Sequence, residues 1–333
     1  MAAIATSRSS LRAAAPNSLF YAAGLVAVAA AVAAPFVVSE GVLRLSTEIL
    51  VIFAMAQMWN LLSGYSGLLS IGHQAFVGAG AYAMFATSVH AGISPYLAML
   101  AAPVIAALLA AVVAPVLFRL RDAYFTIGMW VLSEIVAILV GKSEFLGRQN
   151  GLTLTALRDM DPHWIAPAGF WWAAFAALGV LALMIILLRS RLGLALMAVR
   201  DNDVAASSLG IDVWRSRFVA FVVSAAGTGF CGAIYFLSPA HILPGDAFDP
   251  NWVVITLFIC VIGGLGTIEG PVVGTIVYFM LRQLFADAGN WYLILMGAVA
   301  VLVMLIAPKG LWGTFRSMVP FEIISIRRRP PGE

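Results

Sequence analysis

The residues that could do chemistry are concentrated in one internal segment of an otherwise apolar chain. Residues 189–217 hold five arginines and three aspartates, whereas Asp, Glu, Lys and Arg make up only 11% of the 333 residues. Arg200, Asp201 and Asp203 lie within four positions of one another. Alternating charges of this kind can orient a partner protein, and the flanking arginines can anchor neighbouring segments in anionic lipid headgroups.

The interior of this segment predicts a short helix with caps at both ends. Asn202 or Asp203 can cap the N-terminus of a helix over 204–209, and Gly210 can adopt the left-handed conformation that ends one. Its small side chains would let another protein approach closely, although an ordinary positively charged loop would also explain the composition. The candidate docking residues are Arg200, Asp201, Asn202, Asp203, Ala205, Ala206, Leu209 and Gly210.

Further polar residues interrupt apolar runs. A carboxylate at Glu134 facing lipid would cost several kcal/mol, so it must face the bundle interior, a partner or a wet cavity. It could line or gate a pathway, or make a buried hydrogen bond between helices. His73 and Gln74 favour interhelical hydrogen bonds, as does Asn60 with Gln57. The candidate residues for a translocation pathway or gate are Asn60, His73, Gln74, Gly78 and Glu134.

Glycines are dense between residues 64 and 80. Small residues at helical spacing allow helix backbones to approach closely, and they also weaken a helix, so we expect tight packing and a bend or break here. A gate that flexes at this point is a hypothesis motivated by the same density. The glycines are Gly64, Gly67, Gly72, Gly78 and Gly80.

Several function classes lack the residues they need. His90, His163 and His241 are scattered over expected loops, so no metal site is predicted, and no cofactor. The phosphate-binding pattern G-x-x-x-x-G-K-[ST] is absent, so any nucleotide hydrolysis must belong to another chain. Cys231 and Cys260 fall in apolar runs and are expected to pack as buried thiols. We predict that the chain is not an enzyme.

Composition predicts an all-α polytopic transmembrane bundle. Hydrophobic residues make up 62% of the chain, and apolar runs long enough to cross a bilayer recur along nearly its whole length. The N-terminal part imitates a signal peptide, but its apolar run is longer and we expect an uncleaved first span. The ten candidate spans are 20–38, 43–62, 69–89, 95–118, 124–140, 171–188, 218–237, 252–264, 272–285 and 292–307.

The basic residues predict the orientation of these spans. If the N-terminus is cytoplasmic and the spans alternate, all but five of the 19 Lys and Arg residues fall inside, and both termini are cytoplasmic. The net charge of +3 then reflects membrane topology and does not predict binding to nucleic acid. The expected organisation is a tail over 1–18, a transmembrane domain over 19–308 with a cytoplasmic loop over 189–217, and a basic tail over 309–333.

Five glycine-rich motifs occur in the same order as in a known transporter family. The chain resembles the permeases of branched-chain amino acid ABC importers, and the acid, Ala-Ala and Gly of its charged segment resemble their coupling loop. Arg148 stands where the family loop has a second glycine. The motifs are the stretches 60–82, 121–126 with Glu134, 145–152, 263–271 and 308–313.

The resemblance implies a set of partners. They are a second homologous permease, two cytoplasmic ABC ATPases that dock on the coupling helices, and an extracytoplasmic solute-binding protein, all at the cytoplasmic (inner) membrane. The added N-terminal span and the Pro-Lys-Gly-Leu ending resemble the longer of the two paired permeases. The expected solutes are branched-chain amino acids or related small solutes. The loops 142–168 and 238–251 are candidate docking surfaces for the binding protein.

A secondary transporter is the alternative function. It would bind solute and a coupling ion near the middle of the membrane on broken helices, which Glu134 and the glycines permit. Such a carrier has no need for a capped cytoplasmic helix. Dependence of uptake on ATP discriminates the two.

Overall fold

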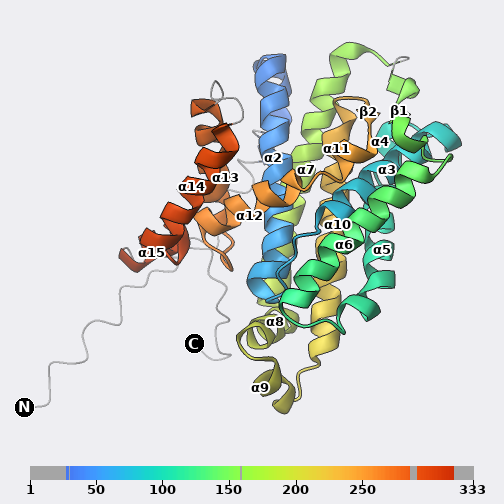
Figure 1. Cartoon of the computed structure of the whole chain (residues 1–333). Helices are drawn as coiled ribbons and strands as arrows, with labels where there is room; N and C mark the ends of the chain where they lie inside the picture. Colours follow the sequence, from blue (N-terminus) through green and yellow to red (C-terminus); the bar gives the residue numbers. More distant parts are fainter. Residues whose placement is uncertain (1–27, 30, 158–159, 286–290, 319–333) are drawn as a thin grey trace, which may run out of the picture.

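The computed structural model describes residues 28–29, 31–157, 160–285 and 291–318. These residues form a bundle of helices in which α8 and α9 lie at one end and the strands β1 and β2 at the other (Figure 1). The elements are α2 (Glu40–Asn60), the π-helix η1 (Leu61–Tyr65), α3 (Gln74–Ala91), α4 (Pro95–Ala98), α5 (Ala101–Leu117), α6 (Ala123–Lys142), η2 (Arg148–Asn150), β1 (Leu152–Thr153), η3 (Thr155–Leu157), α7 (Pro162–Arg189), α8 (Arg191–Asp201), α9 (Asp203–Ser208), α10 (Val213–Leu237), β2 (His241–Ile242), α11 (Pro244–Ala247), α12 (Asn251–Gly263), α13 (Gly270–Leu284), α14 (Trp291–Ile306) and α15 (Gly310–Met318).

Seven helical segments among the described residues are long and apolar enough to cross a membrane. The predicted polytopic α-helical bundle is therefore confirmed, whereas the count of ten spans is not. Each predicted span from 43–62 onward overlaps a helix, but α3 and α13 are not among the seven, and residues 20–27 and 30 of the span 20–38 lie outside the described residues. The seven are Glu40–Tyr65, Pro95–Leu117, Ala123–Lys142, His163–Arg189, Val213–Leu237, Pro244–Gly263 and Ile294–Arg316.

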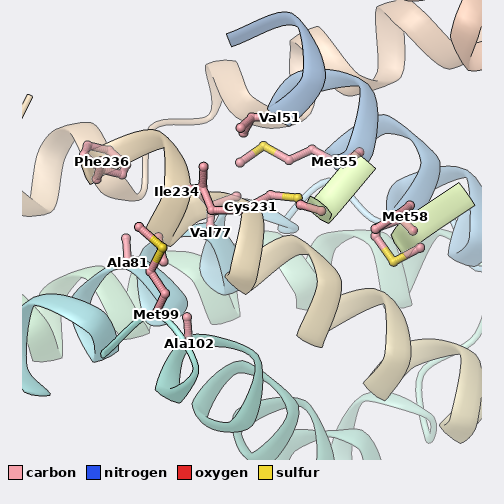
Figure 2. Packing of buried hydrophobic residues seen from close by; sticks show 14 of the residues in the cluster. Val51, Met55, Met58, Val77, Ala81, Met99, Ala102, Cys231, Ile234 and Phe236 are labelled. Atoms are coloured by element: carbon pink, nitrogen blue, oxygen red, sulfur yellow. The ribbon is translucent and has the colours of Figure 1, made fainter. Parts of the chain in front are cut away.

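The centre of the bundle is made by α2, α3, α5, α7 and α10. Helix α10 packs on α2, α3, α5 and α7, while α12 and α13 pack on α2 from another side. Figure 2 shows the side chains of α2, such as Met55 and Met58, close to those of α10, such as Cys231 and Ile234. The methionines and alanines fill the space between helices without polar atoms, so the core is held by dispersion and close packing.

Glycine allows α3 and α10 to touch backbone to backbone. A Cβ atom added to Gly80 would overlap the backbone of Gly229, and one added to Gly78 would overlap the ring of Phe248. The predicted tight packing is therefore confirmed. Helix α3 runs without a break through both glycines, so the expected bend does not occur there.

The expected break lies between α2 and α3, within the glycine-rich stretch 64–80 that predicted it. Helix α2 widens into the π-helix η1 and the chain then turns at Gly67, whose φ is +75°. The turn is fixed by the indole N–H of Trp59, which donates to the carbonyl of Ser70 at 2.7 Å, and by Thr126 of α6, whose hydroxyl donates to Leu69 O at 2.8 Å. These bonds satisfy carbonyl groups that leave the helical pattern.

The two long loops at the end opposite α9 join into one surface. Strands β1 and β2 pair antiparallel, with Leu152 opposite Ile242 and Thr153 opposite His241. This short ladder is the one departure from the predicted all-α fold. Arg148, in the position expected for glycine, has a φ of +53°, so its backbone adopts the left-handed conformation that glycine favours.

We predict that Gly80→Ala destabilises the bundle by about 1–3 kcal/mol, because α3 and α10 must separate to admit one methyl group. The measurement is the thermal unfolding midpoint of the detergent-solubilised protein. Gly179→Ala on α7 is the matched control, since nothing lies within 4 Å of a Cβ at that position. Equal midpoints for the two variants would contradict the close contact.

Candidate functional site

Helix α9 is the predicted capped helix. The Asn202 side chain accepts from Ala205 N at 2.9 Å, and Gly210, with a φ of +81°, follows the last turn. Both predicted caps are confirmed. Val204 and Leu209 are 76% and 80% exposed, so two large apolar side chains project from the end of the bundle.

One expectation for α9 is corrected. Ala206 was expected to present a small surface to a partner, but its side chain is only 2% exposed and packs inward. Ala205, Ser207 and Ser208 are exposed. The reason is the helical period of 3.6 residues, which turns only one position of this short helix, Ala206, toward the neighbouring α8 and α10.

Charged side chains attach this segment to the bundle. Arg217 of α10 pairs with Asp203 of α9 at 2.7 Å, which holds the start of α9 against the start of α10. Arg200, in the last turn of α8, pairs with Asp201 at 2.9 Å and also donates to the carbonyl of Gly64 at 3.1 Å. Arg200 therefore faces inward to η1 as well as outward to solvent.

The end of α2 holds the glycine-rich loop 264–269, which separates α12 from α13. Gln57 donates to Ile268 O at 2.7 Å. Asn60 donates to Thr267 O at 2.8 Å and accepts from Gly266 N at 2.9 Å. Asn60 and Gln57 are fully buried, and these bonds give partners to the middle of the loop, where the backbone makes no helical hydrogen bonds.

Three segments meet at this place. A Cβ on Gly266 would lie 3.0 Å from Arg200 Nη1 and 3.0 Å from Gly64 O, so the loop, the end of α2 and the end of α8 touch one another. We call this arrangement the polar junction, made of Gln57, Asn60, Gly64, Arg200 and the loop 264–269. It connects the segment that carries α9 to the helix at the centre of the bundle.

Sequence reasoning anticipated the stitching role of Asn60 and Gln57 but not their partners. It also placed Arg200 among surface contacts and missed its bond to Gly64. Partners more than 130 positions away leave no trace in residue spacing. The available signal was in the sequence itself. It has two glycine-rich stretches, 64–80 and 263–270, and the apolar run before the first of them ends in the polar residues Gln57 and Asn60.

His73 is a structural residue of the interior. Its Nε2 lies 2.8 Å from Ser224 Oγ, and the Ser224 hydroxyl donates to Met58 O at 2.6 Å. Because that hydroxyl has one proton, it must accept from Nε2–H, which leaves Nδ1 to accept from Ser70, 3.2 Å away. The predicted interhelical hydrogen bonding of His73 is therefore confirmed.

Gln74 is fully buried, and neither atom of its amide has a hydrogen-bond partner among the described residues. Its side chain lines a small space of about 10 Å³ together with Thr228, whose hydroxyl is also without a partner among the described residues. Such a volume is close to the lower limit for one water molecule. Gln74 and Thr228 are the residues of this interior that a polar molecule could satisfy.

Glu134 lies near the middle of α6 and is exposed in the isolated chain. Ile127, Trp130 and Ile138 follow the same helical face and are 53%, 48% and 53% exposed. Of the three surroundings expected for this carboxylate, the interior of this chain is therefore excluded. A partner or a wet cavity between subunits remains.

Among the described residues, no group of three or more His, Cys, Asp or Glu side chains could hold a metal ion. Cys231 and Cys260 are buried free thiols, and the Cys260 thiol donates to Ala56 O at 3.2 Å.

The family described as "Branched-chain amino acid transport system / permease component" matches residues 41–308. The chain belongs to this family. The match confirms the resemblance inferred from the five motifs, and it makes the chain a transport permease. The polar junction and α9 both lie within the matched range of this permease.

Similar permeases are known from bacteria and archaea. The high-affinity branched-chain amino acid transport system permease protein LivM of Salmonella typhimurium is 29% identical over 84% of this chain and 72% of its own length. LivM of Escherichia coli is also 29% identical, over the same shares. A probable LivH permease of Methanocaldococcus jannaschii is 25% identical over 67% of this chain and 76% of its own length. No solved structure matches the chain significantly.

We predict that Asn60→Ala lowers the free energy of unfolding by about 2–4 kcal/mol, because Gly266 N and Thr267 O lose their partner in the interior. Thermal unfolding in detergent measures the change. Asn251→Ala, at an exposed position on α12, is the control and is expected to change little. A stability loss confined to a few tenths of a kcal/mol would refute the junction.

Proposed function

We propose that the chain is the longer permease subunit of an ABC importer that moves branched-chain amino acids, or a related small solute, into the cytoplasm. Separate ATPase subunits supply the energy. The single observation that carries the proposal is a permease of this family with a capped, solvent-facing helix, α9, which Arg217 of the central helix α10 holds through an ion pair with Asp203. A carrier driven by an ion gradient would not need that helix.

The proposed topology follows from the arginines, which are concentrated at the end of the bundle that carries α8 and α9, and from the paired loops at the opposite end. The segment α8–α9 with its arginines lies in the cytoplasm, and the surface of loops 142–161 and 238–250 lies outside, in the periplasm of a bacterium with two membranes. Both termini are then cytoplasmic, with ten spans in the inner membrane. The proposed domain boundaries are those of the sequence, a transmembrane unit over 19–308 between a short tail over 1–18 and a basic tail over 309–333.

The ATPase docks on α9 in this proposal. Val204 and Leu209 supply apolar contacts, and the acidic side chains beside them, Asp201 and Asp203, orient the partner. Arg217 of α10 holds α9 in place through Asp203. A movement of α9 is therefore expected to move α10 as well, and not only the loop between the two helices.

A second permease covers α6 in this proposal. A charged group at the centre of a membrane helix costs about 2.5–3.5 kcal/mol on insertion scales, so Glu134 is not expected to face lipid. The face of Ile127, Trp130, Glu134 and Ile138 is the surface that we assign to the paired permease or to the wet path between the two subunits.

The solute-binding protein docks on the opposite end in this proposal. The pairing of Leu152–Thr153 with His241–Ile242 turns two loops into one surface, which gives a partner a firmer platform than separate loops would. Asp246 and Asp249, at the start of the following helices, are exposed or partly exposed on that end.

The experiment that tests the proposed function is uptake into vesicles that contain the complete complex. We expect uptake to stop when ATP is depleted while the proton and sodium gradients are maintained. Uptake that persists without ATP would support the secondary transporter instead.

For docking, we predict that Leu209→Asp abolishes co-purification of the ATPase without affecting insertion into the membrane, because it removes an apolar contact from the tip of α9. Leu120→Asp is the matched control, since Leu120 is also exposed and lies between α5 and α6 at the same end of the bundle. ATPase retained by the Leu209 variant, or lost equally from both, would contradict the docking surface.

For coupling, we predict that Arg200→Gln keeps the ATPase bound and hydrolysing while transport per ATP falls at least about tenfold. The reason is the lost charge-assisted bond to Gly64 O, which removes a link between α8 and α2. Arg191→Gln, exposed at the other end of α8, is the control. Parallel loss of hydrolysis and transport, or an unchanged ratio, would show that Arg200 does not couple them.

A further inference from the structure

A cavity of about 410 Å³ opens between four helix ends on the side of the bundle opposite α9. Its walls come from the starts of α2 and α7 and from the ends of α10 and α13. This volume lies in the range of 300–1,000 Å³ that small-molecule sites usually have. In the orientation proposed above, the cavity faces the side from which solute arrives.

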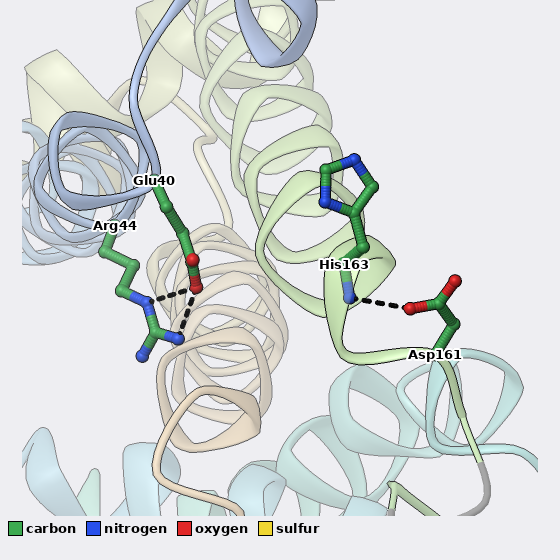
Figure 3. A network of polar contacts seen from close by, with 4 residues as sticks. All are labelled: Glu40, Arg44, Asp161 and His163. Carbon is green, nitrogen blue, oxygen red and sulfur yellow. Dashed lines mark hydrogen bonds and ion pairs between the residues drawn. The ribbon is translucent and has the colours of Figure 1, made fainter.

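One wall of the cavity carries both signs of charge. Glu48 of α2 and Arg282 of α13 pair at 2.6 Å, and the Glu48 side chain is only 23% exposed. Arg44 lies one turn earlier on α2, where Glu40 holds its guanidinium at 2.7 Å in an exposed pair (Figure 3). Exposed pairs of this kind contribute little, so Arg44 can turn to another anion at small cost.

The remaining wall is largely apolar. A branched aliphatic group would meet methyl and methylene groups there, while the hydroxyl of Tyr235 adds a polar edge. The cavity thus divides into a charged half and an apolar half. The apolar residues are Leu45, Ile165, Ala166, Ile234, Leu237 and Pro239.

We propose that this cavity binds the zwitterion of an α-amino acid with an apolar side chain, on the permease itself. Glu48 accepts hydrogen bonds from the α-ammonium group, and Arg282 and Arg44 donate to the α-carboxylate. A zwitterion inserted into the Glu48–Arg282 pair adds no net charge, so each of these partly buried charges keeps an opposite partner. This inference rests on the proposed function, because it assigns the cavity to the cargo of the importer.

The alternative explanation of the Glu48–Arg282 pair is a purely structural role, and the experiment must separate the two. Glu48 and Arg282 are 234 positions apart and connect α2 to α13, which would itself justify an ion pair. A purely structural pair would affect every ligand of the complex alike. A recognition site would distinguish ligands by the group that each residue contacts.

The experiment uses the complete complex in lipid nanodiscs without the solute-binding protein. Calorimetric titration compares L-leucine with 4-methylpentanoate, which lacks the ammonium group, and with 3-methylbutylamine, which lacks the carboxylate. We expect L-leucine to bind most tightly. Glu48→Gln should weaken L-leucine at least about tenfold and leave 4-methylpentanoate unchanged, because only the former presents a charge to Glu48.

A second variant keeps the inference testable if the Glu48→Gln protein does not fold. Arg44→Gln at the exposed rim should weaken L-leucine and 4-methylpentanoate but not 3-methylbutylamine. Glu144→Gln is the matched control, since Glu144 is an exposed carboxylate on the same end that pairs with Arg148 and does not line the cavity.

The outcomes separate the inference from the proposed function. Equal weakening of all three ligands by Glu48→Gln and by Arg44→Gln would overturn the site. So would a complex that imports leucine with ATP and binding protein present but binds none in the nanodisc. Uptake independent of ATP would instead reject the importer assignment and leave the ligand comparison standing.

Discussion

The need to satisfy backbone polar groups away from water governs this structure. Between α12 and α13, residues 265–268 make no backbone–backbone hydrogen bond with any described residue. Gln57 and Asn60 supply the missing partners from α2. The glycines of the loop let its backbone come close enough to reach them, and Gly266, with a φ of +73°, makes the turn.

The same arrangement explains how a distant subunit could act on the centre of the bundle. Arg200 bonds to Gly64 at the end of α2, and Arg217 bonds to Asp203 at the start of α9. In the proposed function, a displacement of the α8–α9 segment would be passed to η1 and α2 through Arg200 of α8 and to α10 through Arg217. Since α2 and α10 pack on each other at the centre of the bundle, the two routes converge on that centre.

Most of the helices could be predicted from sequence, because apolar runs and their charged ends are local properties. The caps of α9 were predictable for the same reason, since Asn202 and Gly210 act on residues beside them. Side-chain direction was less accessible, and Ala206 faces inward although its neighbours face solvent. The pairing of Asn60 with Gly266 and the cavity beside Glu48 depend on tertiary contacts between segments about 200 or more positions apart, which composition and spacing do not encode.

The central claim is that the polar junction makes α9 and the loop 264–269 one mechanical unit. Spin labels at Ser207 and Leu265, both exposed, and at Glu144 on the opposite end would measure it in the complex, on a background without the two buried cysteines. Through the ATP cycle, the distance between 207 and 265 should stay constant while the distance from each to 144 changes. A change between 207 and 265 with a constant distance from 265 to 144 would contradict the account.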